Sequence, residues 1–288
     1  MKKPQWITLI AGIVLTTGLF LFGRTVPKNR TVTVEEHSPD DGHDHGPEVS
    51  PITIDTILNL AKKQLTTEQV VRLSTLENSI SRGDVKDQQV HVYHQLAKFW
   101  ADSVGIFEPY AWYTAEAARL ENSEKTLTFA ARLFLENLQI DDVPQRRQWK
   151  ALQAKDLFER SLLINPANDS TKVGLGATYL FGEISANPME GILKIREVIE
   201  KDSTNVYAQM MLAKGSLLSG QYDKAINRLE TINNMKPGEL DVLLLLAEVN
   251  ERMGNKKKAI EWYKASLSFV KQTELRKAIE GRIDELKK

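Results

Sequence analysis

The feature that most constrains this chain is a repeat of 34 residues near its C-terminus. Two segments align at that spacing: Leu212, Ala213, Gly220, Tyr222, Ala225 and Leu229 in the first, and Leu246, Ala247, Gly254, Lys256, Ala259 and Tyr263 in the second. Paired small residues followed by a glycine are typical of two closely packed helices joined by a turn, and a fixed period of this size outweighs local propensity. The repeat predicts stacked helical hairpins. An unrelated bundle of hairpins is the alternative.

The same pattern continues upstream with insertions. One unit places Leu175, Gly176, Tyr179 and Gly182 in a first helix and Gly191, Ile195, Val198 and Ser203 in a second. It needs about three extra residues in the turn, where Asn187 can cap the second helix and Pro188 can be its first residue. A looser unit places Ala130, Ala131 and Phe134 before an insertion at 141–144, and Ala154, Phe158, Ser161 and Pro166 after it. Several units are needed, because one hairpin cannot bury its apolar face alone.

These spacings resemble the tetratricopeptide repeat, and the whole chain resembles membrane-anchored tetratricopeptide repeat proteins of bacteria. The resemblance covers residues 121–273, where we expect about four repeats, and extends to the earlier helices only in style. We therefore expect an all-α fold, a helical-hairpin solenoid, with helices over 52–120 that pack on the array and a capping helix over 274–288. Thr66 and Gln69 form a candidate capping box, and Pro109 is expected to open a later helix.

The resemblance also implies a binding site. In the family, the first helices of successive repeats line a concave groove that receives a peptide or helix of a partner protein. Carried onto this sequence, the groove candidates are Lys125, Thr128, Arg132, Val173, Ala177, Tyr207, Met210, Lys214, Leu244, Glu248 and Arg252. Members that clamp chaperone tails place Lys and Asn at positions where this chain has Val173, Ala177, Met211, Asp241 and Leu245. A chaperone-tail clamp is therefore not expected.

The N-terminus predicts a membrane anchor over residues 1–23. Residues 6–23 are uncharged, and at roughly 1.5 Å per residue they would span about 27 Å as a helix. A cleaved signal peptide is the alternative, but the end of the run offers no good pair of small residues for cleavage. The short tail before Trp6 favours a single-pass orientation in the bacterial inner membrane with the helical repeats in the periplasm.

Residues 24–51 predict a flexible linker. Residues 31–51 contain six Asp and Glu residues, no Lys or Arg, and several Pro and Gly residues, a composition that cannot bury enough apolar surface to fold. His37, His43 and His45 lie among these acids and could hold Zn²⁺, Cu²⁺ or Ni²⁺ weakly, although a solvated spacer is the favoured interpretation. Asp87, His91 and His94 share one helical face and are interpreted as a surface cluster.

Composition and motifs narrow the function. The net charge is zero and no basic stripe with aromatic residues occurs, so no nucleic-acid partner is expected. Cysteine is absent, and no phosphate loop, nucleophile elbow or zinc-protease motif is present, so we expect no cofactor and no catalysis. The leading hypothesis is an interaction scaffold. The alternatives are a factor similar to the anchored repeat subunits of c-type cytochrome maturation, and metal handling through the histidines of the linker.

Overall fold

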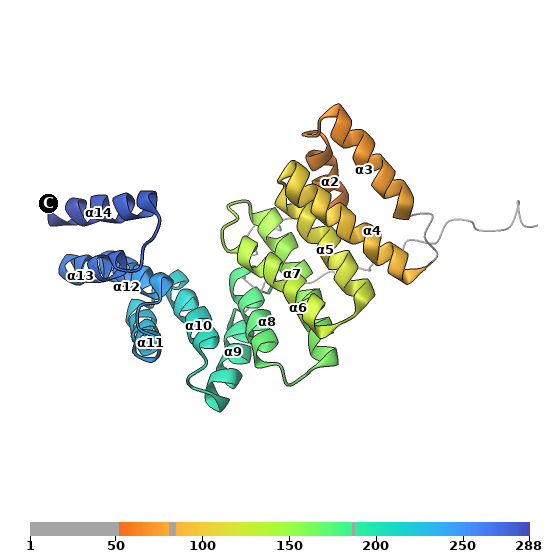
Figure 1. The fold of residues 1–288 in the computed structure, drawn as a ribbon. Coiled ribbons are helices and arrows are strands. Elements are labelled where there is room, and N and C mark those ends of the chain that lie inside the picture. The colour runs from red at the N-terminus through yellow and green to blue at the C-terminus, as the bar shows by residue number, and fades with distance from the viewer. Residues whose placement is uncertain (1–51, 81–84, 186–187) are drawn as a thin grey trace, which may run out of the picture. The chain divides into compact units, whose positions relative to one another are not determined.

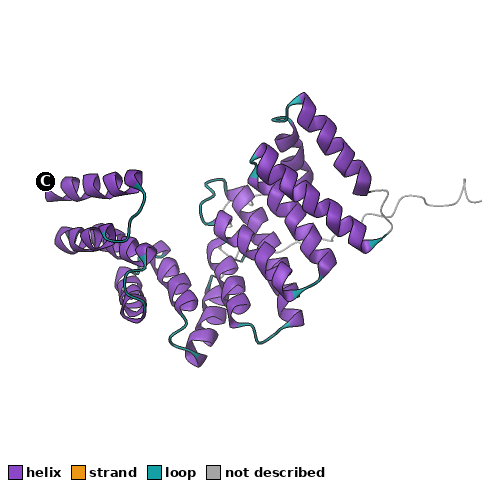
Figure 2. Cartoon of the chain, viewed as in Figure 1, coloured by secondary structure: helices purple, strands orange, loops and turns teal. Residues whose placement is uncertain are grey.

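A computed structural model describes residues 52–80, 85–185 and 188–288. These ranges contain thirteen α-helices, labelled from α2, and one π-helical segment, with no strand among them (Figures 1 and 2). The predicted all-α fold is confirmed. The predicted anchor over 1–23 and linker over 24–51, with its three histidines, lie outside the described residues. Within the described ranges, no helix has the length and apolar character needed to cross a membrane.

The C-terminal hairpins follow the predicted register. Helices α10 (Val206–Leu218) and α11 (Tyr222–Met235) form one hairpin, and α12 (Leu240–Arg252) and α13 (Lys256–Leu267) form the next, each starting 34 positions later than its counterpart. The small residues Ala213, Ala225, Ala247 and Ala259 have no exposed surface, as expected where helices touch. Gly254, between α12 and α13, has a φ of +77°, a left-handed conformation that glycine adopts without strain.

Two further hairpins precede these: α6 (Glu124–Leu138) with α7 (Pro144–Ile164), and α8 (Asp169–Phe181) with α9 (Met189–Lys201). Helices α8 and α9 approach closely, since a Cβ atom on Gly191 would lie 2.4 Å from the backbone oxygen of Gly176. One prediction was wrong by a residue. Pro188 takes the N-cap position of α9 with helical dihedral angles, and Met189 is the first helical residue. Asn187 lies outside the described residues.

The N-terminal part contains α2 (Ile54–Lys62), α3 (Thr67–Ile80), α4 (Lys86–Lys98), the π-helix η1 (Phe99–Val104) and α5 (Phe107–Glu121). The capping box is confirmed, because the Thr66 N–H donates to Gln69 Oε1 at 2.9 Å and the Gln69 N–H donates to Thr66 Oγ1 at 3.3 Å. One detail differs from expectation, because Pro109 does not open α5 but is its third residue.

The described helices belong to one compact unit. Ile57 of α2 and Ala111 of α5 lie in the same apolar cluster as Phe134 of α6 and Phe158 of α7, so the N-terminal helices pack on the hairpin array. Helix α14 (Thr273–Lys287) buries the stripe Ile279, Ile283 and Leu286. The side chain of Arg276 donates to the backbone oxygens of Leu267 and Val270, which satisfies carbonyl groups at and just beyond the end of α13.

Candidate functional site

The predicted groove does not continue across α8. Val173 and Ala177 have no exposed surface, so their assignment as groove residues is corrected. Helices α6 and α10, which come before and after the α8–α9 hairpin, contact each other. The Arg132 guanidinium lies 5.3 Å from the centroid of the Tyr207 ring, and beyond the end of α6 Gln139 Oε1 accepts a hydrogen bond of 3.2 Å from Lys214 Nζ. Val173 and Ala177 of α8 lie in one buried apolar cluster with residues of α6, α7 and α10.

The N-terminal halves of the predicted groove helices are occupied by internal contacts. Thr128 Oγ1 lies 2.8 Å from Ser161 Oγ, and Arg132 donates to Ser170 Oγ at 2.5 Å. Burial raises the pKa of the Tyr207 hydroxyl, an effect that the nearby charge of Arg132 opposes. Lys125 is exposed and lies one turn before Thr128 in α6. Thr128, Arg132 and Tyr207 therefore hold α6 against its neighbours.

A cavity of about 550 Å³ lies where the C-terminal ends of α6, α8 and α10 meet α12. Its apolar lining is formed by Leu138, Ile140, Phe181, Leu217, Leu218 and Leu245. Ile140 is 76% exposed and Leu218 is 71% exposed. Two large apolar side chains that face water at one cavity are typical of an interaction surface.

Three predicted groove residues line this cavity: Lys214, Glu248 and Arg252. Two others do not. Leu244 packs into the apolar cluster that contains Ile279 and Ile283 of α14. Met210 packs between the cluster that contains Phe134 and Phe158 and the apolar cluster of α10–α13. The structure therefore gathers Lys214, Glu248 and Arg252 at one cavity, leaves Lys125 exposed, and places the others of the predicted set in internal contacts.

The charged residues of the cavity are unequally paired. Arg147 contacts Glu183 at 2.9 Å, and Arg252 contacts Glu248 at 2.6 Å. The hydrogen bond and charge of Glu248 raise the pKa of Arg252 above its ordinary value. The half-buried ammonium of Lys214 differs, because no carboxylate of the described residues lies within ion-pair distance and its hydrogen-bond acceptor is the neutral amide of Gln139. A carboxylate would be a stronger partner for this ammonium.

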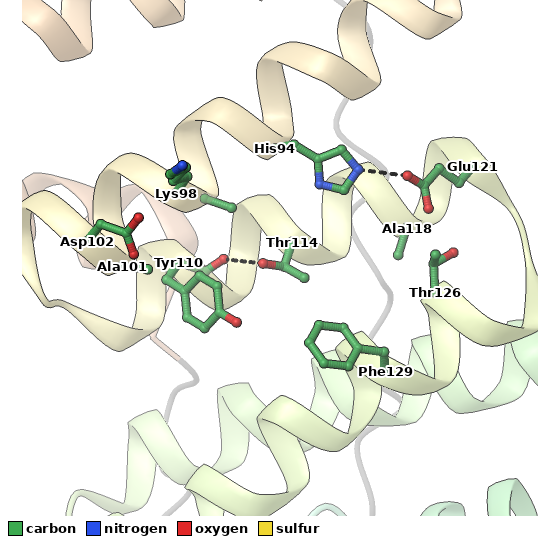
Figure 3. A pocket seen from close by; sticks show the side chains of 11 residues that line it. His94, Lys98, Ala101, Asp102, Tyr110, Thr114, Ala118, Glu121, Thr126 and Phe129 are labelled. Atoms are coloured by element: carbon green, nitrogen blue, oxygen red, sulfur yellow. Dashed lines mark hydrogen bonds and ion pairs between the residues drawn. The ribbon is translucent and has the colours of Figure 1, made fainter.

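A second cavity, of about 360 Å³, lies between α4, η1, α5 and α6 (Figure 3). Phe129 of α6 and Tyr110 of α5 line it, and His94 Nε2 contacts Glu121 Oε1 at 2.7 Å at one end. The sequence analysis did not identify this site. One signal was available, since Phe129 lies out of phase with the buried stripe of Leu127, Ala130, Ala131 and Phe134 along α6.

The histidines of α4 have partners other than a metal ion in this arrangement. His94 is paired with Glu121, and His91 Nε2 lies 3.0 Å from Gln95 Nε2. Among the residues that the structure describes, no group of three or more His, Asp or Glu side chains could hold a metal ion. His37, His43 and His45 lie outside these residues.

Comparison with known proteins identifies the type of fold. Residues 216–280 match the family model of the tetratricopeptide repeat. A tetratricopeptide repeat protein from Parabacteroides merdae ATCC 43184 has a similar structure, with a TM-score of 0.53 and 14% identity over 81% of this chain and 85% of that chain.

Two more distant structures also match. They are YrrB, a TPR protein with an unusual peptide-binding site (TM-score 0.41, 16% identity, 72% of this chain and 97% of that chain), and PilW, a type IV pilus biogenesis factor (TM-score 0.46, 13% identity, 79% and 100%). No curated protein matches the sequence. The family match and the structure from Parabacteroides merdae show that the described helices form a solenoid like that of tetratricopeptide repeat proteins.

Proposed function

We propose that this chain is a non-catalytic scaffold that holds a segment of a partner protein in the cavity at the C-terminal ends of α6, α8 and α10. The observation that carries the proposal is the half-buried Lys214, which lies among apolar side chains without a carboxylate partner in the described residues. Opposite charges attract each other, so a partner carboxylate would bind this ammonium more strongly than the neutral amide of Gln139 does.

The remaining lining defines the partner further. Ile140 and Leu218 offer exposed apolar surface beside Lys214, and a volume of about 550 Å³ accommodates a few side chains. The segment that fits is amphipathic and carries Asp or Glu next to aliphatic residues. Arg147 and Arg252 also line the cavity, but each is paired with a carboxylate of this chain. They therefore help to orient the partner segment and add little net charge to the site.

The proposal is tested by selecting displayed peptides on the full-length chain. We expect the selected peptides to place an acidic residue beside aliphatic ones, and Lys214→Glu to weaken their binding at least about tenfold, which corresponds to about 1.4 kcal/mol. Lys224→Glu is the matched control, because Lys224 Nζ also donates to a glutamine, Gln221 Oε1 at 2.6 Å, but lies exposed on α11 away from the cavity. Equal binding by both variants, with unchanged circular dichroism, would exclude the cavity as the site.

We further propose that residues 6–23 anchor the chain in a bacterial inner membrane, with the helical unit on the periplasmic side. The support is the uncharged run itself and the Lys and Arg residues on both sides of it. Intact-mass measurement of protein extracted from membranes tests the anchor. A mature chain that starts near Thr25 would identify a cleaved signal peptide and overturn the proposal.

A further inference from the structure

The second cavity has aromatic rings and small apolar side chains in its lining. Three alanines, Ala97, Ala101 and Ala118, leave its floor open, and the rings of Tyr110 and Phe129 line it (Figure 3). Phe129 is 54% exposed, although its neighbours in α6 are buried. We call this site, lined by these five residues, the aromatic slot. Its volume of about 360 Å³ is at the small end of the range for binding pockets, so it suits one or two side chains.

The helix that supplies part of the floor is unusual. Residues Phe99–Val104 form a π-helix, a rare conformation that is found often at functional sites. The wide turn buries both Phe99 and Trp100, at 1% and 0% exposure, while Ala101 stays at the slot. Trp100 Nε1 is buried without a hydrogen-bond partner among the described residues. An irregular helix and an unsatisfied donor both reduce stability, so this segment is not optimised for folding alone.

One end of the slot offers a hydrogen-bond acceptor. Glu121 uses Oε1 to contact His94 Nε2 at 2.7 Å, and no described residue donates to its second oxygen, Oε2. The Glu121 side chain is 25% exposed, so this oxygen is only partly hydrated. A hydroxyl group nearby is already engaged, because Thr114 Oγ1 donates to the backbone oxygen of Tyr110 at 2.8 Å. The slot therefore combines apolar walls with the partly buried acceptor of Glu121, while a second carboxylate of the lining, that of Asp102, is exposed. This combination is complementary to a ring that carries an N–H or O–H donor.

We infer that the aromatic slot binds a Trp or Tyr side chain of a partner protein, with the ring against Tyr110 and Phe129 and its N–H or O–H donating to Glu121. Helix α6 carries both Phe129 at the slot and Leu138 at the first cavity. The separation of nine residues places these two side chains on opposite faces of α6, so a partner chain reaches both sites only by crossing this helix. The inference rests on the proposed function, because the occupant belongs to a protein chain.

The test follows the alanine methyl groups by NMR in the full-length chain labelled with ¹³C at these methyls. Titration with N-acetyl-tryptophanamide should move the signals of Ala97, Ala101 and Ala118 upfield through the ring current, and should leave the buried Ala213 of α10 unmoved. N-acetyl-leucinamide at the same concentration should move none of them. Absence of the shifts with the tryptophan amide, or equal shifts with the leucine amide, would overturn the inference.

Single substitutions test the contribution of the apolar walls and that of the acceptor separately. Phe129→Ala should weaken binding of the tryptophan amide by about tenfold, whereas Phe269→Ala, at a phenylalanine of similar exposure after α13, should not change it. Glu121→Leu should abolish the preference for the tryptophan amide over N-acetyl-phenylalaninamide. A preference that survives this change would overturn the role of Glu121.

This titration involves neither the first cavity nor a partner, so the two proposals fail separately. Alanine shifts together with no effect of Lys214→Glu on peptide binding would overturn the proposed function alone. A clear effect of Lys214→Glu without alanine shifts would overturn the aromatic slot alone.

Discussion

A buried cluster of charges at the start of α7 joins three helices, and removing its central cation should destabilise the whole array. Lys150 is 1% exposed. Its ammonium contacts the Asp141 carboxylate, Glu108 Oε1 at 2.7 Å and Asn137 Oδ1 at 2.5 Å. Glu108 belongs to α5, Asn137 to α6 and Lys150 to α7, so a single ammonium connects the N-terminal helices to the first hairpin of the array.

The change Lys150→Met keeps an apolar stem of similar length and removes the charge. Arg146 is then left to pair with both carboxylates, Asp141 at 2.6 Å and Glu108 at 3.4 Å. Removing one partner of a buried ion pair costs about 3–5 kcal/mol, because the remaining charge is not compensated. For a unit of this size each kcal/mol lowers the thermal midpoint by about 2–4 °C, so we expect a loss of roughly 6–20 °C.

Thermal unfolding of the full-length chain, followed by far-ultraviolet circular dichroism, measures this loss. The double change Lys150→Met with Glu108→Gln restores the charge balance and should recover at least half of the loss. Arg160→Met is the control on the same helix, since its pair with Asp156 is solvent-exposed and worth at most about 1 kcal/mol. An equal loss in the Lys150 and Arg160 variants, or no recovery in the double variant, would refute the reasoning.

Three further outcomes are expected. Ala213→Leu should overpack the contact between α10 and its neighbours and cost about 1–3 kcal/mol, measured as a lower thermal midpoint. Gly254→Val should cost about 1–2 kcal/mol in the same assay, because other residues are strained at a φ of +77°. Burial alone would raise the pKa of Asp141, but hydrogen bonds from Arg146 and Lys150 hold it well below its ordinary value of 3.8. This stabilisation is present above the unfolded pKa and is lost as the pH falls toward the folded one, so urea unfolding should show the deficit of Asp141→Asn shrinking below about pH 4.

The hairpins could be predicted because the residues that shape them act locally. Ala213 and Ala247 recur at the repeat spacing since the same helix contact recurs, and Gly254 marks a turn that needs a positive φ. The Thr66 and Gln69 capping box depends on residues three positions apart. The π-helix over 99–104 could not be predicted, because it arises from tertiary packing that buries adjacent Phe99 and Trp100 together.

The closed face of α8 could not be read from the sequence either. The contacts that close it join residues 75 positions apart, Arg132 to Tyr207 and Gln139 to Lys214. Assigning the family's groove residues position by position assumes that the first helix of every hairpin exposes the same face to solvent. That assumption holds only when the first helices of the preceding and following hairpins do not contact each other. The assumption failed for Val173 and Ala177, which have no exposed surface.

Each of the two cavities is lined by residues that depart from the pattern of the hairpins. Phe129 and Leu218 are large apolar side chains on exposed faces, and Lys214 is a half-buried cation without a carboxylate among the described residues. Exposed apolar area and a half-buried cation without a carboxylate both oppose folding. A period in the sequence reveals only the positions at which the same helix contact or turn recurs in each repeat. The positions that we propose for partner binding do not repeat from one hairpin to the next, and they line the two cavities on opposite sides of α6.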